Sequence, residues 1–560
     1  MRATIAVILA TGALVMAALL YGCDASSSSA TDNAPFDDAG EAVPSGDVAG
    51  GDAARADADG FDFAYSDRDQ DTAYDGASAT AVTFNGSGAE AHSAAGDTAT
   101  NVRTSDGAVT LTAEGCYVIS GSLSEASLII DAPDDAKVQV VFNGVRIENS
   151  AGPAVLVESA DKVFITLAEG STNVLNDGTG RSDLPTDGAS VESAAEVDIT
   201  EDDTAEEHAT HDATLFSHDD LTINGSGALT VSSLSAHAIV SKDDLVICGG
   251  TFALNAATDA LQGKDCVKIV AGDFAITAGD DAITSTNTDK PDSAGFVTID
   301  GGSLVINAGD DALHAETILR LTGGSVEVVA CEEGYEGAQI WLDGGQHTII
   351  SADDGLNAAG EARTDFLLDI TGGTLVVTAD GDGIDSNGTL AQSGGEVLIN
   401  GPTNSANGAL DATRATITGG TMLALGAAGM AQTYGEGSTQ AALLYQAAQT
   451  LPAGVIIRLI AADGSELISH TAIRPFSSIA YSSPALAQGE SYTLEVEGEQ
   501  SVSFTLTEAQ AAISADGMVS AYTGGMGGMG GGPGDRGNGG FGGGPGGGPS
   551  GRGDIGRPGN

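Results

Sequence analysis

The stretch FVTIDGGSLVINAGDDALHAETILRLTGGS, residues 296–325, contains one copy of a repeat that runs from Asp219 to Gly420. The copies align on pairs of small residues, and the second members of successive pairs are 22, 30, 22, 21, 28, 22 and 25 residues apart. A recurring period of this kind indicates a solenoid. The pairs are Gly249-Gly250, Ala271-Gly272, Gly301-Gly302, Gly323-Gly324, Gly344-Gly345, Gly372-Gly373, Gly394-Gly395 and Gly419-Gly420.

Each copy contains short apolar runs, such as 296–299 and 303–306, that are bounded by Gly, Asn and Asp. Runs of four or five Val, Ile, Leu and Thr residues are typical of strands. A unit of about 22 residues is also shorter than the two-helix repeats of about 34 residues. The sequence therefore predicts an all-β chain folded as a parallel β-helix, with three short strands in each coil and coils about 4.8 Å apart.

The composition divides the chain into five expected segments. We expect residues 1–22 to be a lipoprotein signal peptide, 23–60 a disordered acidic and Ser-rich spacer, 61–432 the β-helix, 433–507 a C-terminal β-rich module, and 508–560 a disordered Gly-rich tail. Residues 178–214 form an acidic insertion whose His208 and His211 either bind a metal or belong to a solvated loop. Within the C-terminal module, Gln440 to Gln449 is compatible with a helix.

The first residues resemble the leader of a bacterial lipoprotein. An apolar run from Ile5 to Leu20 is followed by Leu20-Tyr21-Gly22-Cys23, which has the form of a lipobox. Acylation of Cys23 would tether the protein to the extracellular face of the membrane, whereas an ordinary signal peptide would release it. We find no internal segment long and apolar enough to cross a bilayer.

Charge and composition exclude some functions. The formal net charge is −59, so the protein is not expected to bind nucleic acid through a broad basic surface. It is expected to attract cations. Only 4% of the residues are aromatic, which predicts a core of stacked aliphatic side chains. We also expect the protein to be a monomer. Cys116, Cys248, Cys266 and Cys331 form no zinc pattern, and they are either free thiols or include a Cys248–Cys266 bridge.

Acidic residues recur at one position of the repeat and predict an outer corner lined with carboxylates. Like charges about 5 Å apart repel by a few kcal/mol at an effective dielectric constant near 20, and Ca²⁺ relieves this repulsion because it takes six to eight oxygen ligands. Alternatively, these side chains accept hydrogen bonds from backbone amides in their turns. The expected calcium ligands are Asp259, Asp280, Asp281, Asp310, Asp311, Asp353, Asp354 and Asp382.

A second ladder combines basic and acidic residues. Its members are 24 and then 22 residues apart and should lie side by side on three coils: His218-Asp219, Lys242-Asp243 and Lys264-Asp265. They either contact sugar hydroxyls or carboxylates, or form weak surface ion pairs. Trp341 and Tyr335 either stack on sugar rings or belong to the core.

Several stretches, among them Phe63 to Tyr74, Ala160 to Gly170 and Leu215 to Gly225, together resemble the family of bacterial carbohydrate-binding domain-containing proteins. This resemblance implies a right-handed parallel β-helix like that of pectate lyases, with bound calcium. It also implies binding of cellulose or polygalacturonate without established catalysis. The sequence departs from the acidic pattern at Glu332-Glu333 and at Asn407. The matching stretches are Phe63 to Tyr74, Asp134 to Val138, Ala160 to Gly170, Leu215 to Gly225, Ile239 to Leu245 and the Asp-Ala-Leu/Ile copies.

Three functions follow from these observations. The first is a cell-surface, calcium-dependent polysaccharide-binding protein with no catalytic residue. The second is a polysaccharide lyase, in which Lys242 or Lys264 would remove the proton beside a uronate carboxylate while a cation neutralises that carboxylate. The third is a structural or adhesive surface solenoid. Product formation separates the first from the second, and retention on a glycan separates the first from the third.

Overall fold

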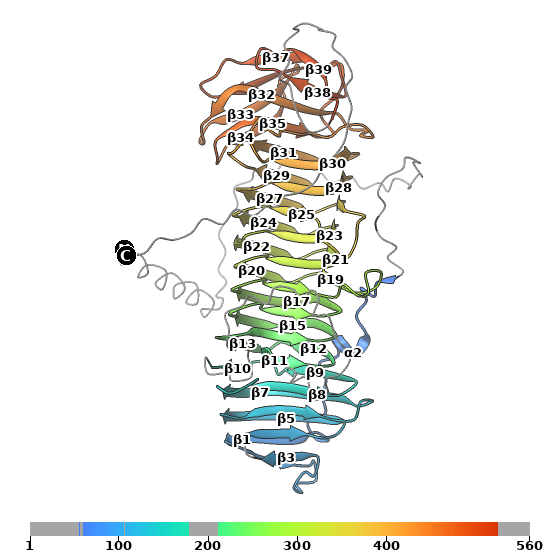
Figure 1. Cartoon of the computed structure of the whole chain (residues 1–560), viewed down its shortest axis with the longest axis vertical. Helices are drawn as coiled ribbons and strands as arrows, with labels where there is room; N and C mark the ends of the chain where they lie inside the picture. The colour runs from blue at the N-terminus through green and yellow to red at the C-terminus, as the bar shows by residue number, and fades with distance from the viewer. Residues whose placement is uncertain (1–54, 56–59, 106, 179–210, 525–560) are drawn as a thin grey trace, which may run out of the picture. The chain divides into compact units, whose positions relative to one another are not determined.

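The computed structural model describes residues 55, 60–105, 107–178 and 211–524. The expected signal peptide, Cys23, His208 and most of the expected tail lie outside these residues. The described part is almost entirely β, with one short helix, α2 (Asp67–Gln70), and a sheet of 35 strands. None of the described helices could span a membrane. The parallel β-helix predicted from the repeat is confirmed, because the strands of successive coils pair in parallel from β5 to β31 (Figure 1).

Three strand ladders form the faces of the solenoid. Face A contains β4 (Ala108–Leu111), β6 (Ser127–Asp131), β8 (Val155–Ser159), β11 (Ala213–Ser217), β14 (His237–Ser241), β16 (Leu261–Gly263), β18 (Ile283–Ser285), β25 (Leu356–Ala358) and the first parts of β21 (Leu313–Leu321), β23 (Tyr335–Leu342), β28 (Ile384–Gln392) and β30 (Leu410–Ile417). Face B contains β1 (Thr80–Gly86), β9 (Lys162–Leu167), β12 (Asp220–Gly225), β19 (Phe296–Ile299), β26 (Leu367–Ile370), the first parts of β5 (Gly115–Ser124), β7 (Lys137–Asn149), β15 (Asp244–Asn255) and β17 (Cys266–Thr277), and the second parts of β21, β23, β28 and β30. Face C contains β10 (Thr172–Asp177), β13 (Ala228–Ser232), β20 (Ser303–Asn307), β22 (Ser325–Ala330), β24 (Gln346–Ser351), β27 (Thr374–Ala379), β29 (Glu396–Asn400), β31 (Thr421–Gly426) and the second parts of β5, β7, β15 and β17.

The register reproduces the period of the sequence. Leu245 pairs with Val267, which is 22 residues later, and Val267 pairs with Val297, which is 30 residues later. These side chains point inward, where they are fully buried with the equivalent residues of the other coils. The interior is therefore made of stacked aliphatic ladders, as the low aromatic content predicted.

The paired glycines mark the bend between faces B and C. At Gly302 the backbone has φ of 93°, and an added Cβ would lie 2.7 Å from the carbonyl oxygen of Gly272 on the preceding coil. Any side chain there would clash with the backbone of its neighbour, so the fold requires glycine at this position.

A segment before the first coil crosses the outside of face B, and we call residues 60–75 the strap. Phe63 contacts Trp341 and Phe296, with ring centroids 5.9 and 5.0 Å away. The Lys268 ammonium donates to the Asp62 carbonyl at 3.1 Å. At α2, Asp69 accepts a hydrogen bond from Thr222 at 2.7 Å. The strap thus covers the outward residues of face B over many coils.

The end of the solenoid is closed by antiparallel strands. β35 (Phe476–Ser482) pairs with β31 and with β32 (Ala442–Leu451). The region that was compatible with a helix is therefore mostly a strand, because pairing on both edges of β32, with β35 and β38, outweighs helix propensity. A separate four-stranded sheet contains β33 (Ile456–Ala461), β34 (Glu466–Thr471), β36 (Ser491–Val496) and β37 (Val502–Thr505).

Ordered structure continues past the expected module boundary at residue 507. β38 (Gln510–Ile513) extends the edge of β32, and β39 (Val519–Ala521) pairs with β38. At the other end, β2 (Ala89–His92) and β3 (Val102–Ser105) form antiparallel pairs with β1 and β4. Residues 508–524, which belong to the segment expected to be a disordered tail, therefore contain two strands.

Candidate functional site

The acidic residues of the repeat lie in the turns that lead from face C into face A. Register places the second acid of each turn in one ladder along the axis, which we call the turn ladder. In the last coil this register assigns Gly408, not Asn407, to the acidic position, because Ile384 pairs with Leu410. The acids of the turn ladder are Asp259, Asp281, Asp311, Glu333, Asp354 and Asp382, and His237 occupies the same position in the coil before them.

The turn ladder is less exposed than the sequence suggested. Asp259 and Asp311 are 5% and 4% exposed, whereas the first acids of the turns, such as Asp280 and Asp310, are exposed. The cause is a hydrogen bond across coils, in which Oδ1 of one acid accepts the backbone N–H of the next. For example, the backbone N–H of Asp311 donates to Oδ1 of Asp281 at 3.0 Å. Hydrogen bonding to backbone amides, which the sequence offered as the alternative to calcium binding, thus occupies one oxygen of each such carboxylate. The second oxygen remains available to a ligand.

A second ladder runs beside the turn ladder on the outward side of face A, and we call it the face ladder. Each of its members lies three residues after the corresponding position of the turn ladder, which is Gly408 in the last coil. It adds a histidine and several carboxylates that our sequence analysis missed, although their constant spacing from the turn acid was a usable signal. Its members are Gln262, Thr284, His314, Glu336, Asn357, Asp385 and Asp411.

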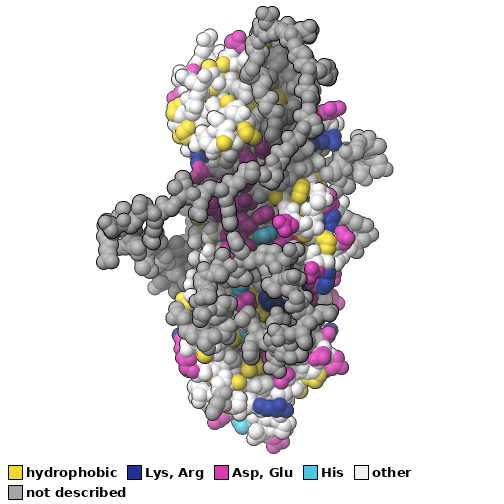
Figure 2. Space-filling model, in the orientation of Figure 1, with side chains coloured by type: hydrophobic (Ala, Val, Ile, Leu, Met, Phe, Trp, Pro, Cys, Tyr) yellow, Lys and Arg dark blue, Asp and Glu magenta, His cyan; other side chains and the backbone are white. Residues whose placement is uncertain are grey.

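The two ladders bring carboxylates together into what we call the acidic column. Three groups place three carboxylate oxygens within 4.8 Å of one another: Asp280, Asp281 and Asp310; Asp311, Glu333 and Glu336; and Asp354, Asp382 and Asp385. A fourth group combines His314 with Asp281 and Asp311, whose Oδ2 atoms are each 3.4 Å from Nδ1 of His314. Figure 2 shows acidic side chains gathered in the central part of the molecule.

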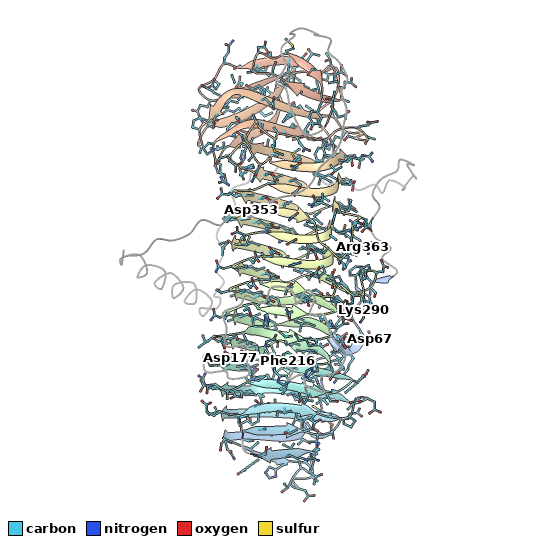
Figure 3. All side chains as sticks on the ribbon, viewed as in Figure 1. Asp67, Asp177, Phe216, Lys290, Asp353 and Arg363 are labelled. Carbon is cyan, nitrogen blue, oxygen red and sulfur yellow. The ribbon has the colours of Figure 1, made fainter. Side chains whose placement is uncertain are left out.

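Two of the predicted calcium ligands belong to none of these groups. Asp259 already accepts hydrogen bonds from Gln262 and from the Asp281 amide, at 3.1 and 3.3 Å. Asp353 is exposed at the edge of the coil (Figure 3). The other six predicted residues lie in the acidic column.

The environment of the column disfavours ionised carboxylates. Burial raises the pKa of Asp354 to about 7 and that of Asp382 to about 6, despite the backbone amides that each accepts. Burial and the neighbouring Asp281 also raise the pKa of Asp311. Burial alone would lower the pKa of His314, but the hydrogen bond to Asp281 and the surrounding carboxylates raise it.

The donors of the column fit a hard divalent cation. Carboxylate and carbonyl oxygens are the ligands that Ca²⁺ prefers. Asn357 adds a specific observation, because its Oδ1 is buried and accepts no hydrogen bond from the described residues. This atom lies in the face ladder between Glu336 and Asp385. A buried acceptor without a donor is costly, and a cation would satisfy it.

These pKa shifts predict an unusual pH dependence. A carboxyl group whose folded pKa exceeds its unfolded value of about 3.9 stabilises the fold at low pH and loses this contribution as pH rises through the folded pKa. We therefore compare the melting temperatures of the wild type and of Asp354→Asn/Asp382→Asn in calcium-free buffer. The difference, wild type minus variant, should decrease as the pH rises from about 4 to about 7. Differential scanning calorimetry measures both values, and a flat difference would contradict the raised pKa values.

The basic ladder has the arrangement that its spacing predicted. Ser241 pairs with Gly263, so Lys242-Asp243 and Lys264-Asp265 lie side by side where face A turns into face B. Asp265 is engaged by Lys290, whose Nζ is 2.7 Å away. Lys264 is exposed and forms no ion pair with the described residues. Figure 3 shows Lys290 and Asp353 at opposite edges of the strands, so this corner and the acidic turns are separated by the width of face A.

The aromatic candidates are structural. Tyr335 is fully buried, and its hydroxyl is 2.9 Å from Nδ1 of His347. Trp341 is 2% exposed beneath Phe63 of the strap, with the Arg55 guanidinium 4.9 Å from its ring. Neither ring can stack on a sugar in this arrangement. Cys248 and Cys266 are free thiols.

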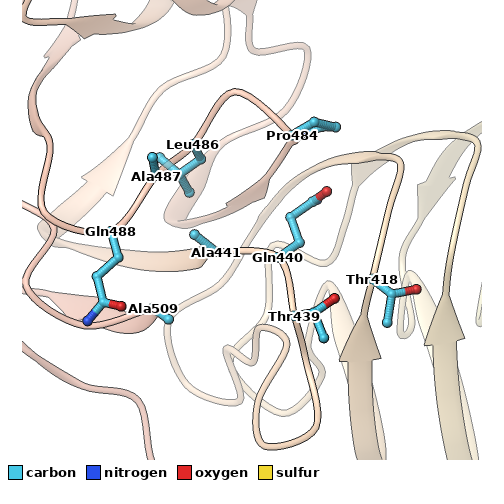
Figure 4. A pocket seen from close by; sticks show the side chains of 9 residues that line it. All are labelled: Thr418, Thr439, Gln440, Ala441, Pro484, Leu486, Ala487, Gln488 and Ala509. Atoms are coloured by element: carbon cyan, nitrogen blue, oxygen red, sulfur yellow. The ribbon is translucent and has the colours of Figure 1, made fainter. Parts of the chain in front are cut away.

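A pocket of about 380 Å³ lies between the last coil and the C-terminal module (Figure 4). Thr418, Gln440 and Gln488 line it together with small neutral residues, and no charged side chain contributes. Gln440 already donates to Ser482 at 2.8 Å. The pocket therefore offers no charged acid or base and no carboxylate or imidazole ligand.

Comparisons with known proteins show a similarity to one protein family over part of the chain. Residues 105–366 match the model of the carbohydrate-binding domain-containing protein family, which confirms the resemblance over that range. A protein of that description from Acetivibrio thermocellus is 32% identical over 160 residues, which are 29% of this chain and 49% of the relative. The chain thus spans about half the length of this curated relative. A solved structure, described as the gadolinium derivative of the polysaccharide lyase-like protein from C. thermocellum, is 28% identical, with a TM-score of 0.35, and the match covers 48% of this chain and 92% of that one.

Proposed function

We propose that this protein binds polysaccharide through divalent cations held by the acidic column, without cleaving the polymer. The observation that carries this proposal is the stacking of three carboxylate groups on successive coils. The matched family description supports a carbohydrate ligand, and the oxygen donors support calcium. The residues of the column would hold the ion, and the ion would neutralise the negative charges of the carboxylates.

The proposed ligand class is an acidic plant-type polysaccharide such as polygalacturonate, with cellulose as the neutral alternative. A chain with a net charge of −59 repels a polyanion, and a cation that binds both partners removes this repulsion. The column continues along the axis over several coils, which gives a polymer repeated points of attachment. Face B is less suited, because the strap covers much of its outward surface.

A lyase is the second candidate, and the arrangement of residues disfavours it. Lys264 is separated from the turn acid Asp259 by the strand β16. At about 3.3 Å per residue, their Cα atoms are roughly 15 Å apart. A base and a cation must act on one uronate ring, and this separation makes shared action unfavourable. We therefore propose no catalytic residue.

We also propose that acylation at Cys23 tethers the protein to the extracellular face of the membrane, or that the protein is secreted if this cysteine is not modified. The lipobox-like sequence supports this proposal.

Retention on insoluble polymers tests the function. The purified protein is mixed with polygalacturonate or cellulose in calcium or in a chelator, and ultraviolet absorbance of unsaturated uronide is followed in the same samples. We expect calcium-dependent retention on polygalacturonate and no growth in absorbance. Absorbance that grows and is abolished in Lys242→Ala/Lys264→Ala would establish a lyase instead. Retention on neither polymer would leave the structural role.

A further inference from the structure

Two histidines and a glutamate meet on face A, several coils before the acidic column. Glu158 belongs to β8, and His218 directly follows β11, which pairs with β8. The pairing of Ser217 with Val157 places His218 beside Glu158, and the His218 amide donates to the Val157 carbonyl at 3.1 Å. His211 precedes β11 and reaches the same point.

The distances between the three side chains suit a metal better than direct hydrogen bonds. Nε2 of His211 and Nε2 of His218 are 3.6 and 3.7 Å from Oε2 of Glu158, beyond the usual hydrogen-bond range of about 2.7–3.2 Å. The three ligand atoms lie within 4.8 Å of one another. Ligands about 2.0–2.2 Å from a tetrahedral ion are about 3.4 Å apart, so a small movement would close the site.

Phe216 holds the two imidazoles in place. Its ring is 1% exposed and makes edge contacts with His211 and His218, with centroids 5.2 and 5.0 Å away. The Lys242 ammonium is 5.3 Å from the same ring, and Asp212, 3.8 Å from that ammonium, offsets its charge. Ligands that are already positioned lose less conformational freedom when an ion binds.

We infer that Glu158, His211 and His218 bind a zinc ion. Two imidazole nitrogens and one carboxylate oxygen form a donor set that Zn²⁺ favours. Ca²⁺ prefers oxygen ligands alone, so this site and the three carboxylate groups of the acidic column favour different metals. The fourth position is left to water. The inference does not depend on the proposed polysaccharide function.

Zinc titration of the purified protein tests this site. With calcium present in excess to occupy the acidic column, calorimetry should detect one equivalent of Zn²⁺, and Co²⁺ should give the visible absorption of a tetrahedral site. His211→Ala and His218→Ala should each weaken zinc binding at least about tenfold and remove the cobalt spectrum. Glu158→Gln should weaken it as well, and this exposed substitution is compatible with folding.

His92→Ala is the matched control, because it removes an exposed imidazole at the end of β2 that belongs to neither metal-binding group, and it should leave zinc binding unchanged. The melting temperature of each metal-free variant verifies its folding. Absence of zinc binding to the wild type would overturn the inference. Unchanged binding in His211→Ala/His218→Ala would overturn it too, as would an equal loss in His92→Ala.

Discussion

Replacing Asp354, Asp382 and Asp385 together by asparagine should strongly weaken calcium-dependent retention on polygalacturonate, and it should also raise the melting temperature of the calcium-free protein. These three carboxylates form one group of the acidic column. Calcium dissociation constants range from about 10⁻⁹ to 10⁻³ M with the charge and rigidity of the ligands. Loss of three charges should therefore raise the calcium concentration for half-maximal retention at least about a hundredfold.

The rise in stability has a separate cause. Burial raises the pKa values of Asp354, Asp382 and Asp385, so ionisation of each group at neutral pH opposes folding. Asparagine removes the charge and keeps the oxygen that accepts a backbone amide, as Asp382 does from Gly408 at 2.5 Å. Calorimetry of the calcium-free variant and a retention assay measure the two effects independently.

A matched variant separates the column from the general charge of the protein. Asp97→Asn/Asp131→Asn/Asp135→Asn removes three exposed carboxylates that lie outside the column. It lowers the net negative charge by the same amount and should leave calcium dependence and melting temperature nearly unchanged. If both triple variants lose retention equally, binding depends on overall charge, and the column is not the site.

The repeat predicted the solenoid because it recurs in copy after copy from Asp219 to Gly420. A period in small and acidic residues fixes the register, as the pairing of Leu245 with Val267 illustrates. The ladder of turn acids followed from the same period. The face ladder could have been found in the same way, because His314, Glu336 and Asp385 each follow a turn acid by three residues.

Other features depend on contacts between distant parts of the sequence. Nothing near Trp341 indicates that Phe63, from before the first coil, covers it. Glu158 and His218 are separated by the acidic insertion, and only the pairing of β8 with β11 brings them together. The strand β32 has the composition of a helix, and its partners decide its conformation. The sequence near each of these residues does not indicate which distant segment it will contact.

Trp341→Ala should lower the free energy of unfolding by about 3–5 kcal/mol, the usual cost of removing a large buried aromatic side chain, and leave polysaccharide retention unchanged. The indole is 2% exposed between Phe63 and the Arg55 guanidinium. It also donates to Gln339 at 3.0 Å. Its removal would leave a cavity under the strap while the acidic column on face A stays intact. Denaturant unfolding measures the stability, and the retention assay measures binding.

Fluorescence gives a second test, because Trp341 is the only tryptophan in the sequence. A buried indole should emit at short wavelength and should not respond to added polygalacturonate. Trp341→Phe, which keeps an aromatic ring against Phe63, should lose less stability than Trp341→Ala. If Trp341→Ala instead unfolds like the wild type and loses retention, the strap must leave face B when polysaccharide binds. Face B, and not the acidic column, would then be the binding surface.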